Sequence, residues 1–497
     1  MRLLFGVAVL GLSPGAVTST QLTAVSVRTA AELQAALDRA LPGDVVELEP
    51  GRDYLGRFVL PARRDRGETF ITLRTRGRWP SERDRVTPDT AATFAVLRSP
   101  DDEPALRTSP GSHHWRIENL TVRGGGRRAG TLIALGAADE TQRTTVDVPH
   151  HLVLARLYLH GDDAGAQRRG LALNSASTDV LASWIDGIRA AGDDSQAIAG
   201  WNGPGPFRIA NCHLEAAGEV LLFGGGDPSV PDLVPSNITI VDSHLTRPAA
   251  WRGGEGGWTI KNLLELKNAR DVLIEGNLLE HHWPEAQSGY AVLFTPRNQD
   301  GTASWSTVEQ VRFVGNVVRH VSGGISILGQ DDEQQSGRAR DLTITDNLFV
   351  DIGGDWGEPG DFLQMGDGPA DVRVERNLVL QTGRVLSVYG SGDRRTSPGF
   401  VFRDNVVRHN RYGMLGDAVG TGRVALRRFL PDAVVRGNVF AGGPSGDYPE
   451  GNEFLPPTAL DDVLIEGEGG YAWRDGRAVG RLDLGRFTAV LARAGAR

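Results

Sequence analysis

Two closely spaced lysines are the first candidate chemical groups in this chain. Lys261 and Lys267 are the only lysines among 53 Lys and Arg residues, and both lie in the stretch WTIKNLLELKNARDVLIEGN at 258–277. Alternate residues of an extended strand share a face, so Lys261, Glu265 and Lys267 lie together. Because an unpaired charge is costly in an apolar interior, we expect this face to meet solvent. The structural alternative is a solvated strand in which Glu265 simply pairs with the lysines.

A further cation follows on the next stretch of similar sequence. The segment YAVLFT at 290–295 matches NLLELK at 262–267, and this alignment sets Lys267 beside Thr295 on an adjacent strand about 4.8 Å away. Arg297 lies two residues further on, so the two cations are predicted to reach a common substrate. The intervening polar segment EHHWPEAQSG is predicted to be a loop that walls the same cleft. The candidate substrate-binding residues are Lys261, Glu265, His281, His282, Trp283 and Asn298.

A lysine beside an arginine suits β-elimination on an acidic sugar. Neutralising the substrate carboxylate makes the C5 proton acidic, a base removes that proton, and an acid assists the leaving oxygen. A lysine can act as the base when desolvation and cationic neighbours favour its neutral form, whereas arginine does not readily lose its proton. We therefore predict Lys267 as the base and Arg297 as the acid or the carboxylate clamp.

A repeat organises the chain around these residues. Six segments, such as VLIEGNLLE at 272–280, carry an Asn at their sixth position, with 28 to 39 residues between successive Asn residues. Alternating nonpolar residues before each Asn predict a strand, and the Asn predicts a tight bend. Fainter copies lie upstream, and in one of them Cys212, the single cysteine, takes the Asn position as a buried bend residue. The six asparagines are Asn277, Asn316, Asn347, Asn377, Asn405 and Asn438.

The repeat predicts an all-β solenoid. Each copy also holds a second apolar strand, often ending in Gly, with no intervening helix, which suits coils that stack on their neighbours. The simplest architecture is a right-handed, single-stranded parallel β-helix with an internal asparagine ladder. A propeller is the competing architecture, but it needs about four hairpin-linked strands in each repeat, and hairpin signals are not prominent.

Three segments flank or close the solenoid, which we assign to 28–445. A capping helix is predicted at 29–41, because Thr29 and Glu32 form a capping box and a solenoid end needs a cover. The tail 446–497 lacks clean repeats and is expected to pack over the other end. Residues 1–19 resemble a secretory signal peptide, so we expect a secreted, periplasmic or extracellular protein.

The helix, the following segment GDVVELEPGRDY and the repeats together resemble the pectin-lyase-like superfamily of right-handed parallel β-helices. Within them, ELKNARDVLIEGNLLE and GYAVLFTPRN resemble polysaccharide lyase family 6, the alginate lyase and chondroitinase B type. The resemblance implies that Lys267 is the base, that Asn277 is a structural residue and that Arg297, in a diverged FTPRN stretch, is the acid. An acidic residue on the Lys strand helps to hold Ca²⁺ in that family, but Glu265 stands closer to Lys267 than that pattern expects.

Other functional classes remain open or are disfavoured. The net charge of −9, with Arg, Asp and Glu interspersed, gives no dense basic patch for nucleic acid, and no apolar run after the N-terminus would span a bilayer. We expect a monomer that binds an acidic polysaccharide. The alternatives are a non-catalytic envelope or carbohydrate-binding β-helix, and a glycoside hydrolase that uses loop carboxylates. The loop carboxylates in question are Asp162-Asp163, Asp193-Asp194 and Asp331-Asp332-Glu333.

Overall fold

The structure is a computed structural model of the 497-residue chain. It describes residues 24–495 apart from 64–66, 80, 82, 126–127, 163–164, 254–255, 288, 395, 468–469, 475–478 and 481. The predicted signal segment 1–19 and Asp163 lie outside the described residues.

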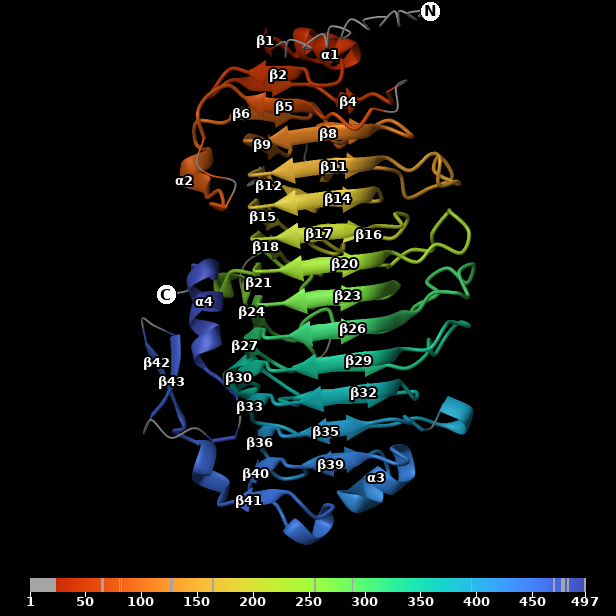
Figure 1. Ribbon diagram of the computed structural model, residues 1–497, viewed down its shortest axis with the longest axis vertical. Coiled ribbons are helices and arrows are strands. Elements are labelled where there is room, and N and C mark those ends of the chain that lie inside the picture. Colours follow the sequence, from red (N-terminus) through yellow and green to blue (C-terminus); the bar gives the residue numbers. More distant parts are fainter. Residues whose placement is uncertain are drawn as a thin grey trace, which may run out of the picture.

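Three long sheets run along the molecule, and the chain visits them in turn, once in each coil (Figure 1). Within the described residues, sheet A contains β1 (Ala24–Val27), β2 (Val45–Leu48), β5 (Ile71–Thr75), β8 (His113–Glu118), β11 (His150–Ala155), β14 (Ala176–Leu181), β17 (Phe207–Ala210), β20 (Ser236–Val241), β23 (Ala269–Glu275), β26 (Val308–Val314), β29 (Arg340–Thr345), β32 (Ala370–Glu375), β35 (Val401–Arg403) and β39 (Val434–Arg436). Sheet B contains β3 (Asp53–Leu55), β6 (Ala95–Arg98), β9 (Leu120–Arg123), β12 (Tyr158–His160), β15 (Trp184–Ile188), β18 (His213–Ala216), β21 (His244–Thr246), β24 (Leu278–His282), β27 (Val317–Val321), β30 (Leu348–Ile352), β33 (Leu378–Gln381), β36 (Val406–Arg408), β40 (Val439–Ala441) and β41 (Glu453–Leu455). Sheet C contains β4 (Phe58–Leu60), β7 (Leu106–Thr108), β10 (Arg128–Leu135), β13 (Ala166–Leu173), β16 (Gln196–Gly200), β19 (Leu221–Phe223), β22 (Leu264–Leu266), β25 (Val292–Phe294), β28 (Ile325–Leu328), β31 (Leu363–Gly366), β34 (Leu386–Val388), β37 (Met414–Gly416) and β38 (Gly420–Thr421).

The strands of each sheet pair in parallel with the strands of the next coil, apart from β38, which pairs antiparallel with β37. Alternation fixes which side chains enter the interior: in β23, Val272 and Ile274 are buried, and each pairs in register with a buried residue of β26. The side chains of all three sheets thereby share one apolar core. The prediction of a right-handed parallel β-helix is confirmed, and the propeller alternative is wrong.

The repeated asparagines form one continuous column between sheets A and B. The Asn277 amide donates to the Asn316 Oδ1 at 3.0 Å, and the same bond recurs from each Asn to the next, ending on Asn452. The residue before each Asn, such as Gly276 with φ of 65°, is the one with left-handed backbone. The bend therefore uses two neighbouring residues: one supplies the left-handed geometry, and the Asn supplies the hydrogen bonds. Cys212 lies in the same column and is fully buried, and burial raises the pKa of its thiol to about 11.

Replacing Asn316 by alanine is expected to lower the free energy of unfolding by about 2–4 kcal/mol, because it leaves buried backbone groups without partners. The Asn316 Oδ1 accepts from the backbone N–H of Asn277 at 2.9 Å, and its Nδ2 donates to the Ile274 carbonyl at 2.9 Å. Urea unfolding measures the change, with the exposed Gln335→Ala as the control for loss of an amide side chain. Equal stability of the two variants would contradict a structural role for the column.

The ends of the solenoid are covered by helices. α1 (Ala30–Arg39) lies over the first coil (Figure 1), and its capping box joins Thr29 to Glu32. α3 (Arg423–Phe429) closes the far end with Leu426 and Phe429 buried in the main core. The other helices are α2 (Pro88–Ala91), α4 (Gly485–Ala494) and the short 3-10 helices Ala249–Trp251, Gly354–Trp356, Gly392–Arg394, Ser445–Asp447 and Pro457–Leu460.

Only the first part of the C-terminal tail lies over the end of the solenoid as expected, with Tyr448 and Phe454 packed on the main core. After β41 the chain turns back, and α4 lies along the outer face of sheet B beside β24 and β27, together with the antiparallel pair β42 (Leu464–Gly467) and β43 (Gly470–Trp473) (Figure 1). Phe487 and Leu491 pack there against Leu278, Val317 and other apolar side chains that point outward from sheet B. The tail therefore covers a second apolar face, one that a strict inside-outside alternation does not reveal.

Candidate functional site

Lys267 and Arg297 lie just past adjacent strands on the outer side of sheet C. Strand β22 pairs with β25 so that Leu266 lies opposite Phe294, which places Lys267 next to Thr295. The backbone N–H of Arg297 donates to the Lys267 carbonyl at 2.9 Å. Both side chains line one hollow of about 220 Å³. The structure thus brings the two predicted cations to a common site, as the alignment of the coils predicted.

Glu265 projects to the same side but does not face open solvent, which corrects the expectation from sequence. The residue is 1% exposed, because its neighbours in register on both sides are leucines, Leu222 and Leu293. Its carboxylate accepts a hydrogen bond from the Asn262 amide at 3.0 Å, and Lys267 Nζ lies 3.7 Å away. Burial raises the pKa of Glu265, and the charge of Lys267 opposes that shift. The site therefore contains a buried carboxyl group in contact with a lysine.

Arg297 is held by two aspartates of the following coil. Its Nη1 donates to Asp331 at 2.8 Å and also to Asp332. Burial alone would lower the pKa of Arg297, but the hydrogen bonds to Asp332 and Asp331 outweigh it and raise the pKa. Within the described part of the chain, Nε and Nη2 have no such partner. The guanidinium is thus fixed in place with N–H groups still available to a ligand.

The sequence DDE at 331–333 is an anchored turn and not a freely solvated one. Asp331 is buried and accepts from the backbone N–H groups of Asn298 and Glu333 at 2.8 and 3.0 Å. Burial alone would raise the pKa of Asp331, but these bonds and Arg297 lower it.

Asn298 also has a different position from the one expected. It is 2% exposed, its Nδ2 donates to the Gln335 carbonyl at 2.8 Å, and its Oδ1 accepts from the Ala303 N–H at 2.8 Å. Its amide joins the two loops that carry Arg297 and Asp331, so it positions them and its side chain is not free for substrate.

Lys261 is held apart from Lys267. Its Nζ contacts Asp194 at 2.7 Å and the buried Glu219 at 3.2 Å. Burial alone would lower the pKa of Lys261, but these carboxylates raise it. Lys261 does not line the hollow that holds Lys267. Its observed role is to neutralise Glu219, which also accepts a hydrogen bond from Gln196.

His281, His282 and Trp283 do not wall the site, because β24 continues through the first two of these residues. His282 is buried against Ser322, with 2.9 Å between Nδ1 and Oγ. His281 stacks on the ring of His320 on the outer side of sheet B. Trp283 is 4% exposed and packs in a small apolar cluster. The loop predicted at 280–289 is therefore shorter, and it reaches the site only through its later residues.

A larger hollow of about 510 Å³ adjoins the first and shares Gln287, Leu293, Thr295 and Arg297 with it. We call the two together the sheet C groove. It crosses β22, β25, β28, β31 and β34, which at about 4.8 Å between strands gives a length of about 19 Å. Residues of the groove that sequence reasoning missed are Gln287, Tyr290, Ser326, Gln364, Arg384 and Tyr389.

Some of these missed residues had a detectable signal. Ser326 and Gln364 occupy the register position of Glu265 on later coils, so extending the alignment beyond YAVLFT would have found them. Tyr389 follows β34 as Lys267 follows β22. A Cβ atom added to Gly366 would lie only 2.2 Å from Cζ of the Tyr389 ring. The glycine therefore leaves room for that ring. Arg384 lies in a turn and is held by Asp361 at 2.7 Å, a contact with no sequence signal.

No protein-family model matches the chain, and no curated protein matches it. Solved structures do. The PL6 family alginate lyase AlyGC aligns with a TM-score of 0.51 at 14% identity, over 91% of this chain and 55% of that one. This chain is a right-handed parallel β-helix protein. An alginate lyase from Paenibacillus sp. str. FPU-7 aligns at 12% identity over 87% of this chain and 97% of that one, with a TM-score of 0.25. A GH87 α-1,3-glucanase from Streptomyces thermodiastaticus strain HF3-3 aligns at 13% identity over 86% and 66%, with a TM-score of 0.48.

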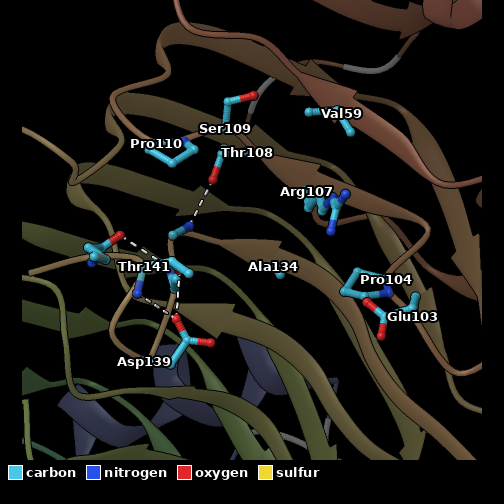
Figure 2. A pocket seen from close by; sticks show the side chains of 13 residues that line it. Val59, Glu103, Pro104, Arg107, Thr108, Ser109, Pro110, Ala134, Asp139 and Thr141 are labelled. Atoms are coloured by element: carbon cyan, nitrogen blue, oxygen red, sulfur yellow. Dashed lines mark hydrogen bonds between the residues drawn. The ribbon is translucent and has the colours of Figure 1, made fainter. Parts of the chain in front are cut away.

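This β-helix protein has a third hollow, of about 520 Å³, near the N-terminal end of sheet C (Figure 2). Its Asp139 accepts hydrogen bonds from the hydroxyl and backbone N–H of Thr141 at 2.6 and 2.9 Å, and these bonds lower the pKa of Asp139. Thr108 accepts from the Gly136 N–H at 2.8 Å. These polar groups therefore shape a loop, and neither lysine lines this hollow, so the sheet C groove is the better candidate.

The carboxylates beside the lysines do not suit Ca²⁺, which prefers several oxygen ligands free of competing donors. Glu265 has Lys267 and the Asn262 amide against it. Glu219 has Lys261 at 3.2 Å and the Gln196 amide at 2.9 Å. Nitrogen donors thus occupy the carboxylate oxygens that Ca²⁺ would need, and these residues do not fit a calcium site.

Proposed function

We propose that this protein is a secreted polysaccharide lyase that cleaves a uronate-containing polysaccharide by β-elimination. The observation that carries the proposal is the placement of Lys267 and Arg297 on adjacent coils, lining the same hollow on the outer side of sheet C. The other groups in this hollow are mostly polar, as a sugar ligand requires. They are Glu265, Gln287, Leu293, Thr295, Asn298, Gln299, Asp331, Glu333 and Gln334.

The shape of the groove supports a polymeric substrate. A length of about 19 Å across five strands exceeds that of a single sugar ring. Arg384 and Tyr389 at its far end add a cation and an aromatic face, the groups that bind acidic and flat sugar surfaces. An acidic polysaccharide is thus the proposed ligand, despite the net charge of −9, because the cations are local to the groove.

Glu265 offers a way to prepare Lys267 as a base. Burial disfavours the charged form of a carboxyl group, and it raises the pKa of Glu265. The Glu265 carboxylate is therefore a proton acceptor that lies 3.7 Å from the Lys267 amine. In the proposed reaction the unprotonated amine of Lys267 takes the C5 proton of the bound uronate.

Arg297 acts on the carboxylate or on the leaving oxygen. Its Nη1 is committed to Asp331 and Asp332, which fixes the plane of the guanidinium. The remaining N–H groups point donors at the substrate with little reorganisation during the reaction. Because arginine does not readily release its proton, we assign Arg297 to charge stabilisation. Lys267 takes the C5 proton and returns it to the leaving oxygen as the C4–O bond breaks and the C4–C5 double bond forms.

Export and a monomeric state belong to the same proposal. The N-terminal segment resembles a signal peptide, and α1 and α3 cover the two ends of the solenoid, where open sheet edges would favour pairing with another chain. Among the described residues, no helix is long and apolar enough to cross a membrane.

Glycoside hydrolysis is the second candidate, because one hollow holds two carboxyl groups with opposite pKa shifts. The pKa of Glu265 is raised and that of Asp331 is lowered, and such a pair can divide the roles of acid and base. Asp331, however, is already committed to backbone N–H groups and to Arg297, so we place this candidate second.

Incubation with a panel of uronate polysaccharides is expected to give ultraviolet absorbance from an unsaturated product, because β-elimination leaves a C4–C5 double bond. Reducing ends are measured in parallel, and a neutral glucan serves as the control substrate. New reducing ends without absorbance would favour hydrolysis. Binding without either product would favour the non-catalytic carbohydrate-binding alternative and reject the lyase.

A further inference from the structure

Four histidines form a compact array at the start of two neighbouring strands of sheet A. His113 and His114 begin β8, and His150 and His151 begin β11. The strands pair in register with His113 opposite His150. The rings of His113 and His150 stack at 4.9 Å between centroids, and those of His114 and His151 stack at 4.6 Å. This array lies near the N-terminal end, separate from the sheet C groove.

The ring nitrogens converge. Each of His114, His150 and His151 offers one ring nitrogen, and these nitrogens lie within 4.8 Å of one another. Nδ1 of His113 lies 2.8 Å from Nδ1 of His114, and the two Nδ1 atoms of the second pair are 2.6 Å apart. An N–H···N bond needs a free lone pair on its acceptor, so at least one imidazole in each pair is neutral at that atom. The neutral imidazole is the form that binds metals.

The repeat shows that imidazoles are not needed at these positions for the fold. His114 and His151 have left-handed backbone, with φ of 57° and 53°. On six later coils the same register position has left-handed backbone too, but it carries smaller or more flexible polar side chains. They are Ser177, Asn237, Asp271, Gln310, Asp341 and Asp371. Histidine pairs on two consecutive coils therefore call for an explanation other than bend geometry.

We propose that His114, His150 and His151 of this array, the His114/His150/His151 site, bind one divalent first-row transition metal ion such as Zn²⁺. Imidazole ligands suit Zn²⁺, Cu²⁺ and Ni²⁺, whereas Ca²⁺ and Mg²⁺ prefer oxygen. Two nitrogens on a tetrahedral Zn²⁺ stand about 3.3 Å apart, given Zn–N bonds of about 2.0–2.1 Å. A bound ion would thus move the Nδ1 atoms of His150 and His151, 2.6 Å apart in the structure, about 0.7 Å further from each other and replace the proton that they share. The exposed His151 ring leaves a path by which the ion enters.

The ion would join two coils and so add to the stability of the N-terminal third of the solenoid. In a stacked array each coil contacts mainly its neighbours, so a ligand shared by β8 and β11 holds that interface closed. Binding to the folded chain alone raises the melting temperature by mass action. This role is independent of the proposed lyase activity, and its test needs no substrate.

Titration of chelator-treated full-length protein with ZnCl₂, followed by calorimetry, is expected to give one ion per chain and a raised melting temperature. CaCl₂ and MgCl₂ are expected to do neither. The double variant His150→Gln/His151→Gln should lower the affinity for Zn²⁺ by at least about tenfold, since it removes two imidazole ligands. His150 is half-buried and His151 is exposed. These two side chains are the more exposed members, so the variant retains the buried packing of His114.

His320→Gln is the matched control. His320 also stacks on another histidine, His281, at 5.7 Å, but that cluster contains two imidazoles and not four. The His320→Gln variant is therefore expected to bind Zn²⁺ with the same affinity as the unmodified protein. Absence of Zn²⁺ binding, or equal binding by the double variant, would overturn the site and leave the four rings as a stack that serves packing only. Visible absorbance of the Co²⁺ form, if lost in the double variant, gives a second readout that does not depend on stability.

Discussion

The Lys267→Ala variant is expected to lose about 10²- to 10⁴-fold in the rate of formation of the unsaturated product, the range typical of a proton-transfer group. The side chain is 18% exposed and lies beside the buried Glu265, 3.7 Å from its carboxylate. Removing it leaves no lysine in the groove, because Lys261 is held by Asp194 and Glu219. The initial rate of the absorbance increase, at equal concentrations of folded protein, measures the effect.

Two further variants separate proton transfer from charge. Lys267→Arg keeps a cation in the same hollow but cannot readily release its proton, so its rate is expected to stay close to that of the alanine variant. Lys261→Arg preserves the ion pairs of the other lysine and is expected to keep nearly full activity. If Lys267→Arg were as active as the unmodified protein, Lys267 would only bind the substrate. If the unmodified protein released reducing ends without absorbance, and Glu265→Gln abolished that release while Lys267→Ala did not, the hydrolase candidate would gain.

The sequence was a sufficient guide to the fold because a solenoid repeats itself by translation. Once Asn277 and Asn316 are recognised as equivalent, every residue between them has a known partner one coil away. That rule placed Lys267 beside Thr295 and brought Arg297 to the same hollow, without knowledge of any loop. It also identified Cys212 as a member of the buried column.

The errors arose where side chains depart from that rule. Inside-outside alternation predicts that Glu265 points outward, but it does not predict that Leu222 and Leu293 on the neighbouring coils bury it. The polar run that contains His282 predicts a loop, whereas His282 is the last residue of β24 and is hydrogen-bonded to Ser322. Asn298 joins residues more than thirty positions apart, a contact that depends on how two loops fold together and leaves no local pattern.

The tail illustrates a different limit. Residues such as Leu278 and Val317 interrupt the expected polar outer face of sheet B, and they are buried by Phe487 and its neighbours. From the sequence alone, Leu278 and Val317 are predicted to face inward, because each repeat holds several consecutive apolar side chains. Only the position of α4 along sheet B distinguishes the two faces.

The Arg247→Met variant is expected to lower the free energy of unfolding by about 3 kcal/mol or more, because it leaves several buried carbonyl groups without a donor. Arg247 is 0% exposed, and burial lowers the pKa of its guanidinium to about 9, so it remains charged at neutral pH. It donates to the carbonyls of Gly218, Lys261 and Asn262 at 2.9, 2.6 and 2.8 Å. Urea unfolding followed by tryptophan fluorescence measures the loss.

Arg252→Met is the control, because both arginines stack on a tryptophan, at 5.8 Å for Arg247 over Trp283 and 5.5 Å for Arg252 over Trp356. Arg252 is exposed, so its loss should change the free energy of unfolding by less than about 0.5 kcal/mol.

Arg247 also supports the sheet C groove, because it binds the backbone carbonyls of Lys261 and Asn262, and the Asn262 amide donates to Glu265. The Arg247→Met variant should therefore have lower lyase activity than the unmodified protein, even under conditions in which it stays folded. An unchanged rate in a destabilised but folded Arg247 variant would mean that Glu265 and Lys267 keep their positions without this support, and that the groove is positioned by sheet C alone.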